Sequence, residues 1–144
     1  MFINFTEAGA DSLGSRSEVR VFKAASAITK NRWVAFDLDQ TAVADDFLYV
    51  EHAPGVATVG SKLAFGVALE DAAAGALVKV CVAGYCAEAY VDGAAVAGSA
   101  LIGPIGTAGQ AAIEAPGTTT GKVCGVALAA DTSNVAPVLV VKSV

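Results

Sequence analysis

One pattern occurs twice in the sequence, and it constrains the fold more than any other feature. Residues 66–69 and residues 125–128 both read Gly-Val-Ala-Leu, and each segment leads through small and polar residues into an apolar run. In the first copy, Val78, Val80 and Val82 alternate with other residues. This period of two is typical of a β-strand with one buried face. Each copy therefore predicts a β-hairpin.

Two copies of a hairpin are too few for a solenoid, which needs about three or more repeats to bury its faces. Similar hairpins can instead close on one another, so we expect an all-β fold, a small β-barrel or β-sandwich. Turn signals recur along the chain at short intervals, as at Lys30-Asn31, His52–Gly55 and Asp92-Gly93. This spacing is typical of all-β domains. The one helix that we expect is a short one near Glu70–Gly75.

The composition agrees with an all-β fold in a single domain. The chain has 144 residues, of which 55% are hydrophobic, 7% aromatic and 16% charged, and it has 15 glycines. Small apolar residues and frequent turns suit short strands, whereas long amphipathic helices need more charged residues. The mean hydropathy is +0.60. However, the sequence contains no uninterrupted apolar stretch of about 18 residues, the length needed to span a membrane. We attribute the high hydropathy to buried strands and a large interface between subunits.

The chain divides into an extended N-terminal arm, residues 1–19, and a β-domain, residues 20–144. In the arm an apolar tip precedes a polar run rich in Gly and Ser, which is typical of a terminal segment without a partner strand. A first strand of the domain at Phe2–Phe5 is the alternative. Outside the hairpins, we expect strands near residues 20–23, 33–36, 47–51, 87–91 and 110–114, and a loop with short strands over 96–109.

The charge is unevenly distributed. Residues 1–32 contain five basic and three acidic side chains, a net charge of +2, and the remaining residues contain four and eleven, a net charge of −7. An acidic body disfavours nucleic acid as a partner, because phosphate binding needs clustered Lys and Arg. The basic N-terminal part suits an acidic protein surface.

Three cysteines, Cys81, Cys86 and Cys124, cannot form a complete set of disulfides. The N-terminus lacks the features of a secretory signal, so we expect buried, reduced thiols in a protein assembled in the cytoplasm. His52 is the sole histidine, and no C-x-x-C pair is present. The sequence therefore predicts neither a zinc site nor a cysteine nucleophile, and we expect no cofactor.

An enzymatic alternative comes from residues 34–41, an apolar strand followed by D-x-D-x-T. This segment resembles the first motif of the haloacid-dehalogenase phosphatases. The resemblance implies that Asp37 attacks a phosphoryl group and that Asp39 acts as general acid and base beside Mg²⁺. Such chemistry needs a parallel α/β sheet and a late acidic pair. The sequence shows no strand–helix alternation, and Asp131 is the sole carboxylate after Glu114.

A second resemblance covers residues 56–144. The Gly-Val-Ala-Leu segment, the acidic Ala/Gly turn at Asp71–Gly75 and the alternating valines that end at Gly84 resemble the small phage head-decoration (cement) proteins. The chain departs from that family in its longer N-terminal portion. The resemblance implies a capsid-associated β-barrel without enzymatic activity.

We therefore expect a virion protein that binds the outside of the assembled capsid and stabilises contacts between major capsid subunits. It is assembled in the host cytoplasm and located at the capsid surface, and it binds neither nucleic acid nor a membrane. A closed homo-oligomer, a trimer by preference, fits the apolar excess. A tail or fibre component and the magnesium-dependent phosphatase are the alternatives. The predicted interface consists of apolar anchors and basic side chains: Phe2, Ile3, Phe5, Arg16, Arg20 and Lys23.

Overall fold

A computed structural model describes residues 16–42, 45–46, 48–55, 64–114 and 122–144. The regular secondary structure of these residues consists of β-strands and contains no α-helix, so the predicted all-β class is confirmed. Within them, no helix has the length and apolar character needed to cross a membrane. The strands in chain order are β1 (Ser17–Ala24), β2 (Trp33–Phe36), β3 (Tyr49–His52), β4 (Ala64–Ala68), β5 (Leu77–Tyr90), β6 (Ala100–Ile102), β7 (Ala112–Ile113), β8 (Val123–Ala127) and β9 (Val135–Val140).

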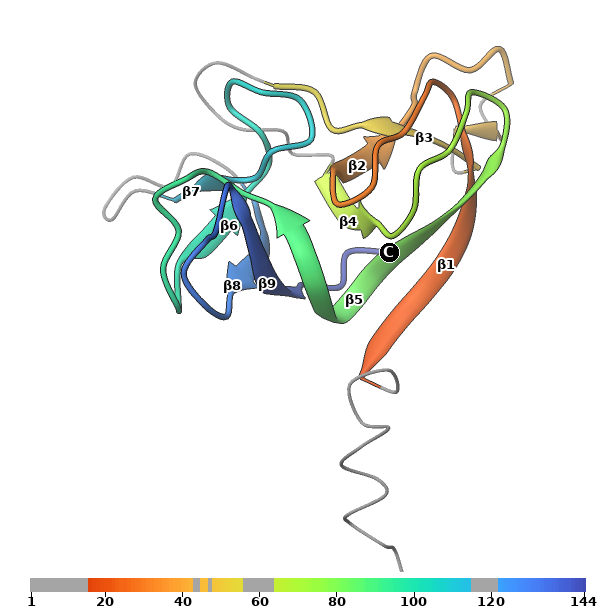
Figure 1. The fold of residues 1–144 in the computed structure, drawn as a ribbon. Coiled ribbons are helices and arrows are strands. Elements are labelled where there is room, and N and C mark those ends of the chain that lie inside the picture. The colour runs from red at the N-terminus through yellow and green to blue at the C-terminus, as the bar shows by residue number, and fades with distance from the viewer. Residues whose placement is uncertain (1–15, 43–44, 47, 56–63, 115–121) are drawn as a thin grey trace, which may run out of the picture.

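Five strands close into a small barrel (Figure 1). Their order is β1-β3-β2-β4-β5, and β5 pairs with β1 to complete the ring. The pairing of β1 with β3 is parallel, and the other pairings in the ring are antiparallel. The prediction of a small β-barrel is thus confirmed.

Aromatic and branched side chains fill the barrel. The Phe36 and Phe65 rings are stacked at 4.2 Å between centroids, and Phe22 contacts both rings edge-on. The alternating residues Val78, Val80 and Val82 belong to the same buried cluster. The face that the alternation predicted is therefore the inner wall of the barrel.

The remaining strands extend the sheet away from the barrel. β5 has 14 residues, and its second half leaves β1 to pair with β9. From there the order continues β9-β8-β6-β7 (Figure 1). We call β6 to β9 the outer sheet. A second buried cluster unites residues of the barrel strands, such as Trp33 and Cys81, with Leu101 and Val138 of the outer sheet.

The two predicted hairpins are confirmed as β4–β5 and β8–β9, but their registers differ. Val67 pairs with Cys81 in the first hairpin, whereas Val126 pairs with Leu139 in the second. The connection of the second hairpin turns through two left-handed residues, Ser133 and Asn134.

The short helix predicted near Glu70–Gly75 is wrong. The segment is extended at Ala72, which exchanges backbone hydrogen bonds of 2.8 and 2.9 Å with Ile28, and it turns at Gly75 with φ of 82°. Pairing with Ile28 uses the amide and carbonyl groups that a helix would need for its own hydrogen bonds.

The strand expected at 33–36 is β2, and the other expected strands exist with shifted bounds. The strand expected at 87–91 is not separate but is the end of β5, because the chain bends at Gly84 (φ 83°) without leaving the sheet. The strand at 110–114 shrinks to β7, and the loop over 96–109 contains β6. The alternative strand at Phe2–Phe5 lies outside the described residues.

Candidate functional site

The outer side of β1 and β5 carries apolar and basic side chains together. Because Phe22 and Ala24 point into the barrel, the alternating residues Val19, Val21 and Lys23 point outward. Val21 is 56% exposed and lies opposite Lys79, and Leu77 is 68% exposed and lies opposite Lys23. We call Val19, Val21, Lys23, Leu77 and Lys79 the β1 face.

Two of the predicted basic interface residues lie on β1, but each already has a partner in its own chain. Arg20 donates a hydrogen bond of 2.9 Å to Glu18, which also accepts one of 2.8 Å from Lys142. These two partners, Lys142 first, hold the pKa of Glu18 below its usual value. The Lys23 ammonium lies 5.3 Å from the centre of the Tyr49 ring.

Arg16 lies at the start of the described chain. Its carbonyl oxygen accepts a hydrogen bond of 3.3 Å from the Tyr85 amide, which joins the entry to β1 with the bend in β5. The predicted apolar anchors Phe2, Ile3 and Phe5 lie outside the described residues. The proposed arm, residues 1–19, therefore overlaps β1 at Ser17–Val19.

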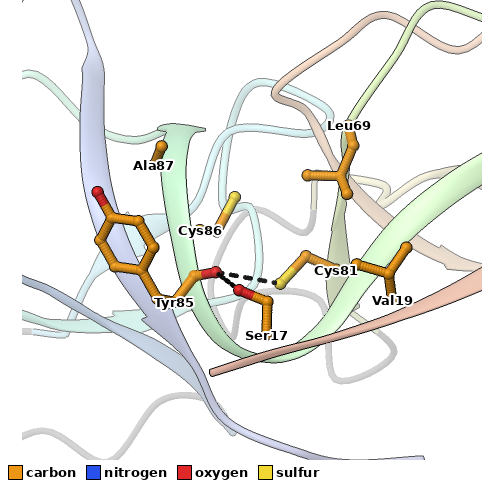
Figure 2. Close-up of a pocket in the computed structure, with 7 residues that line it drawn as sticks. All are labelled: Ser17, Val19, Leu69, Cys81, Tyr85, Cys86 and Ala87. Carbon is orange, nitrogen blue, oxygen red and sulfur yellow. Dashed lines mark hydrogen bonds between the residues drawn. The ribbon is translucent and has the colours of Figure 1, made fainter. Parts of the chain in front are cut away.

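A cavity of about 330 Å³ lies beside the start of β1 (Figure 2). Ser17 Oγ donates a hydrogen bond to the Tyr85 carbonyl, and Cys81 Sγ lies 3.8 Å from the same oxygen. The remaining lining is mostly apolar side chains, so the cavity has room and chemistry for a small apolar group. The residues that line it are Ser17, Val19, Leu69, Cys81, Tyr85, Cys86 and Ala87.

The three thiols are unbridged and buried, in agreement with the expectation of buried cysteines. Contact with the neighbouring Cys86 thiol lowers the pKa of Cys81. The same contact, together with burial, raises the pKa of Cys86. Burial raises the pKa of Cys124 to about 12. Cys81 is thus the thiol that ionises most readily.

The candidate phosphatase motif follows β2 as a tight polar turn. Asp37 accepts hydrogen bonds of 3.0 Å from the Asp39 amide and 2.7 Å from the Gln40 side chain. Burial, with the nearby charges of Asp37 and Asp39, raises the pKa of Glu51. Within the described residues, no three His, Cys, Asp or Glu side chains are grouped to hold a metal ion.

The sheet around this motif differs from the one that the phosphatase resemblance requires. β2 lies between β3 and β4, and both pairings are antiparallel. The resemblance needs a parallel sheet flanked by helices, so its structural expectation is wrong for this chain.

His52 lies on β3 apart from the thiol cavity. Its Nε2 atom accepts a hydrogen bond of 2.9 Å from the Thr29 amide. Burial, and to a lesser extent the charge of Arg32, lowers the pKa of His52. The neutral imidazole therefore holds the turn that precedes β2.

A second exposed surface, on the outer side of β8 and β9, was not predicted from the sequence. Leu128 and Leu139 are both 44% exposed, Val126 is partly exposed opposite Leu139, and Val141 is also exposed. Neither strand contains a charged residue. We call Val126, Leu128, Leu139 and Val141 the β9 face. The apolar run from Val135 to Val141 could have indicated this surface, because a strand with apolar residues on both faces usually has both faces covered.

This fold, a closed five-stranded barrel with an appended sheet, has a counterpart among solved structures. It is similar to the crystal structure of the N base of the head fiber gp8.5 of bacteriophage phi29, with a TM-score of 0.53. The two chains are 21% identical, and the similarity covers 88% of this chain and 96% of that one. At this identity the likeness concerns the fold alone. No protein-family model matches the sequence, and no curated protein matches it.

Proposed function

We propose that this chain is a structural protein of a phage head. The observation that carries the proposal is the likeness in fold to the base of a phage head fiber, which extends over 96% of that base. The resemblance of residues 56–144 to head-decoration proteins rests on the sequence and is independent of the fold, and it supports the same class.

In its finer form, the proposal is that the protein binds the outside of the assembled capsid and cements neighbouring major capsid subunits. The β1 face suits this role, because its exposed valines and Leu77 offer apolar contact and Lys23 and Lys79 offer positive charge. The whole chain has a net charge of −5. A local basic surface on an acidic protein favours docking in one orientation on an acidic patch.

Attachment through several weak contacts makes dissociation slow, because each contact keeps the others at high effective concentration. We assign Phe2, Ile3 and Phe5 of the arm as apolar anchors on a neighbouring subunit, with Arg16, Arg20 and Lys23 supplying charge. The pairing of Arg20 with Glu18 does not prevent this role, since an exposed ion pair is held weakly and can exchange partners.

The β9 face is the proposed contact between copies of this chain in a closed oligomer, a trimer by preference. An uncharged apolar surface can be buried against another copy without desolvating a charged side chain. Symmetric attachment of an oligomer also multiplies the contacts with the shell. The proposed location is the capsid surface, and the proposed partners include neither nucleic acid nor a membrane.

The test is the binding of purified protein to capsids that lack it. We expect the full chain to cosediment with these capsids. Removal of residues 1–15 leaves β1 intact and should abolish binding, while the circular dichroism of the folded body is retained. The double variant Lys23→Glu/Lys79→Glu should weaken binding. Lys122→Glu is the control, because it reverses the charge of an exposed lysine that precedes β8 and lies outside the β1 face. Unchanged binding of the truncated and charge-reversed variants would refute the assignment of the arm and the β1 face.

A fibre component is the second candidate, and the head-fiber base favours it as much as it favours a head protein. Electron microscopy of labelled particles separates the two. A cement protein should occupy many equivalent positions on the shell, and a fibre base should lie beneath a projecting fibre.

We further propose that the protein has no enzymatic activity. Hydrolysis of a generic phosphate ester should not depend on Mg²⁺ and should be the same in the Asp37→Asn variant. A magnesium-dependent rate that this variant loses would restore the enzymatic alternative.

A further inference from the structure

Two cysteines on one strand lie at the bend where the barrel passes into the outer sheet. Cys81 is in the part of β5 that pairs with β1 and β4, and Cys86 is in the part that pairs with β9. Gly84 lies between them with φ of 83°. Both thiols line the same cavity (Figure 2).

In a regular strand these two cysteines could not meet. Residues five positions apart are about 17 Å apart and point to opposite faces. Here the bend at Gly84 brings the Tyr85 carbonyl back to within 3.8 Å of Cys81 Sγ, and it turns both cysteines toward one buried cluster. The Cys86 thiol donates a hydrogen bond of 3.3 Å to the Glu88 carbonyl, and its sulfur lines the same cavity as the Cys81 sulfur.

The two thiols also have complementary chemistry. The neighbouring Cys86 thiol lowers the pKa of Cys81, so Cys81 supplies the attacking thiolate. The cavity beside them is apolar and has a volume of about 330 Å³, which gives a small reagent a place to approach. Cys124 differs on each count: it is 2% exposed, its thiol donates to the Leu101 carbonyl at 3.5 Å, and it does not line this cavity.

We propose that Cys81 and Cys86 are an oxidisable pair that closes to an intramolecular disulfide when a disulfide oxidant such as oxidised glutathione is present. The Cys81 thiolate attacks one sulfur of the oxidant, forms a mixed disulfide and releases one glutathione thiolate. The Cys86 sulfur, losing its proton, then attacks Cys81 and releases the second glutathione thiolate. The protein loses two electrons and two protons, and the oxidant is reduced to two glutathione molecules.

The bridge would tie the two halves of β5 together across the bend. A reducing cytoplasm keeps such a pair open, and an oxidising exterior closes it. A particle protein would therefore be assembled with free thiols and bridged after release; this last step rests on the proposed function, whereas the chemistry of the pair does not.

The chemistry is tested on the purified, fully reduced chain, which makes it independent of capsid binding. The protein is incubated with oxidised glutathione, denatured, alkylated with N-ethylmaleimide and examined by intact mass and peptide mapping. Before alkylation the mass should fall by about 2 Da, the two hydrogens of one disulfide. One alkylated cysteine should remain, Cys124, and a peptide should link Cys81 to Cys86.

Single variants show whether the pair is specific. Cys124→Ala should form the bridge as the parent chain does. Cys81→Ala and Cys86→Ala should form no internal bridge, and tryptophan fluorescence of Trp33 verifies that they remain folded. Three alkylated cysteines in the parent chain, glutathione retained on Cys81, or a bridge that involves Cys124 would each overturn the proposal.

Discussion

The barrel and the outer sheet are built from similar hairpins but bury their apolar side chains in different ways. In the barrel, each of the five strands has hydrogen-bonded neighbours on both sides, and its inner valines and phenylalanines pack against one another. In the outer sheet, β6 and β7 have three and two residues. One face of that sheet packs on the outer wall of the barrel, and the other carries exposed leucines. The barrel therefore buries its apolar side chains within its own ring of strands. The outer sheet buries one face against the barrel and leaves apolar side chains exposed on the other.

Two adjacent residues of β2 show how the halves are connected. Trp33 belongs to the cluster shared by barrel and outer sheet, and Val34 belongs to the barrel interior. An added Cβ at Gly125 of β8 would lie 2.9 Å from the Trp33 ring, so the ring lies directly against the outer sheet. The alternation of a single strand thus serves both cores.

The largest effect is expected from Trp33→Ala, which should lower the free energy of unfolding by about 3–5 kcal/mol. Val34→Ala removes less buried area and should cost about 2 kcal/mol. Urea denaturation followed by circular dichroism gives both values. Hydrogen exchange should show that Trp33→Ala loosens β8 and β9 selectively. Equal exchange of these strands in the two variants would contradict the division into two cores.

Gly84→Ala should cost about 3 kcal/mol, because a Cβ there would collide with the Arg16 carbonyl oxygen at a left-handed φ of 83°. Gly75→Ala is the matched control: φ is 82°, but nothing lies within 4 Å of the added Cβ. It should cost about 1 kcal/mol, the left-handed backbone alone. If thermal or urea denaturation gave equal losses, the close packing at the bend would not be what stabilises the junction.

In the proposed oligomer, Leu139→Lys should separate copies of the chain and change the free energy of unfolding by no more than about 0.5 kcal/mol, since Leu139 is exposed in one chain. Val21→Lys, on the β1 face, should leave the oligomer intact. Light scattering after size exclusion measures both masses. If the oligomer persisted in Leu139→Lys and dissociated in Val21→Lys, the β1 face and not the β9 face would form the contact between copies.

The smallest effect is expected from His52 at the edge of the barrel. Its pKa is lowered from the usual 6.5, so the unfolded chain binds its proton more readily, and stability should fall as the pH drops below about 6.5. The neighbouring Glu51 has a raised pKa, and its contribution changes in the opposite direction, favouring the folded state at low pH. Between pH 6.5 and pH 4.5, above the range in which the depressed pKa of Glu18 contributes, the loss on acidification should therefore be steeper in Glu51→Gln and absent in His52→Gln. Urea midpoints at several pH values provide the measurement, and an unchanged slope in His52→Gln would exclude the imidazole as its source.

The sequence predicted those parts of the fold that depend on local alternation. Val78, Val80 and Val82 define an inner face by themselves, and the turn at Asn31 follows from residue type. The closure of the barrel was less accessible, because the pairing of β5 with β1 joins residues about 60 positions apart and leaves no local signature. The helix expected near Glu70 failed for a related reason, since Ala72 pairs with the distant Ile28.

The candidate sites show the same limit. The basic residues Arg20 and Lys23 could be identified by charge, but their partners Glu18 and Tyr49 required the fold. Cys81 and Cys86 line one cavity, although residues five positions apart in a regular strand point to opposite faces. The bend at Gly84 causes this arrangement, and its left-handed conformation is allowed by a glycine but cannot be predicted from one.

The single long strand β5 also determines how the molecule would respond to mechanical load. β1 runs antiparallel to the first half of β5, from Lys23 opposite Leu77 to Ser17 opposite Gly84, and β9 runs antiparallel to the second half. Tension along β5 would therefore shear these two ladders, loading many hydrogen bonds together instead of opening them one after another. Because β5 pairs with β1 over its first half and with β9 over its second half, its backbone would transmit a force between the barrel and the outer sheet.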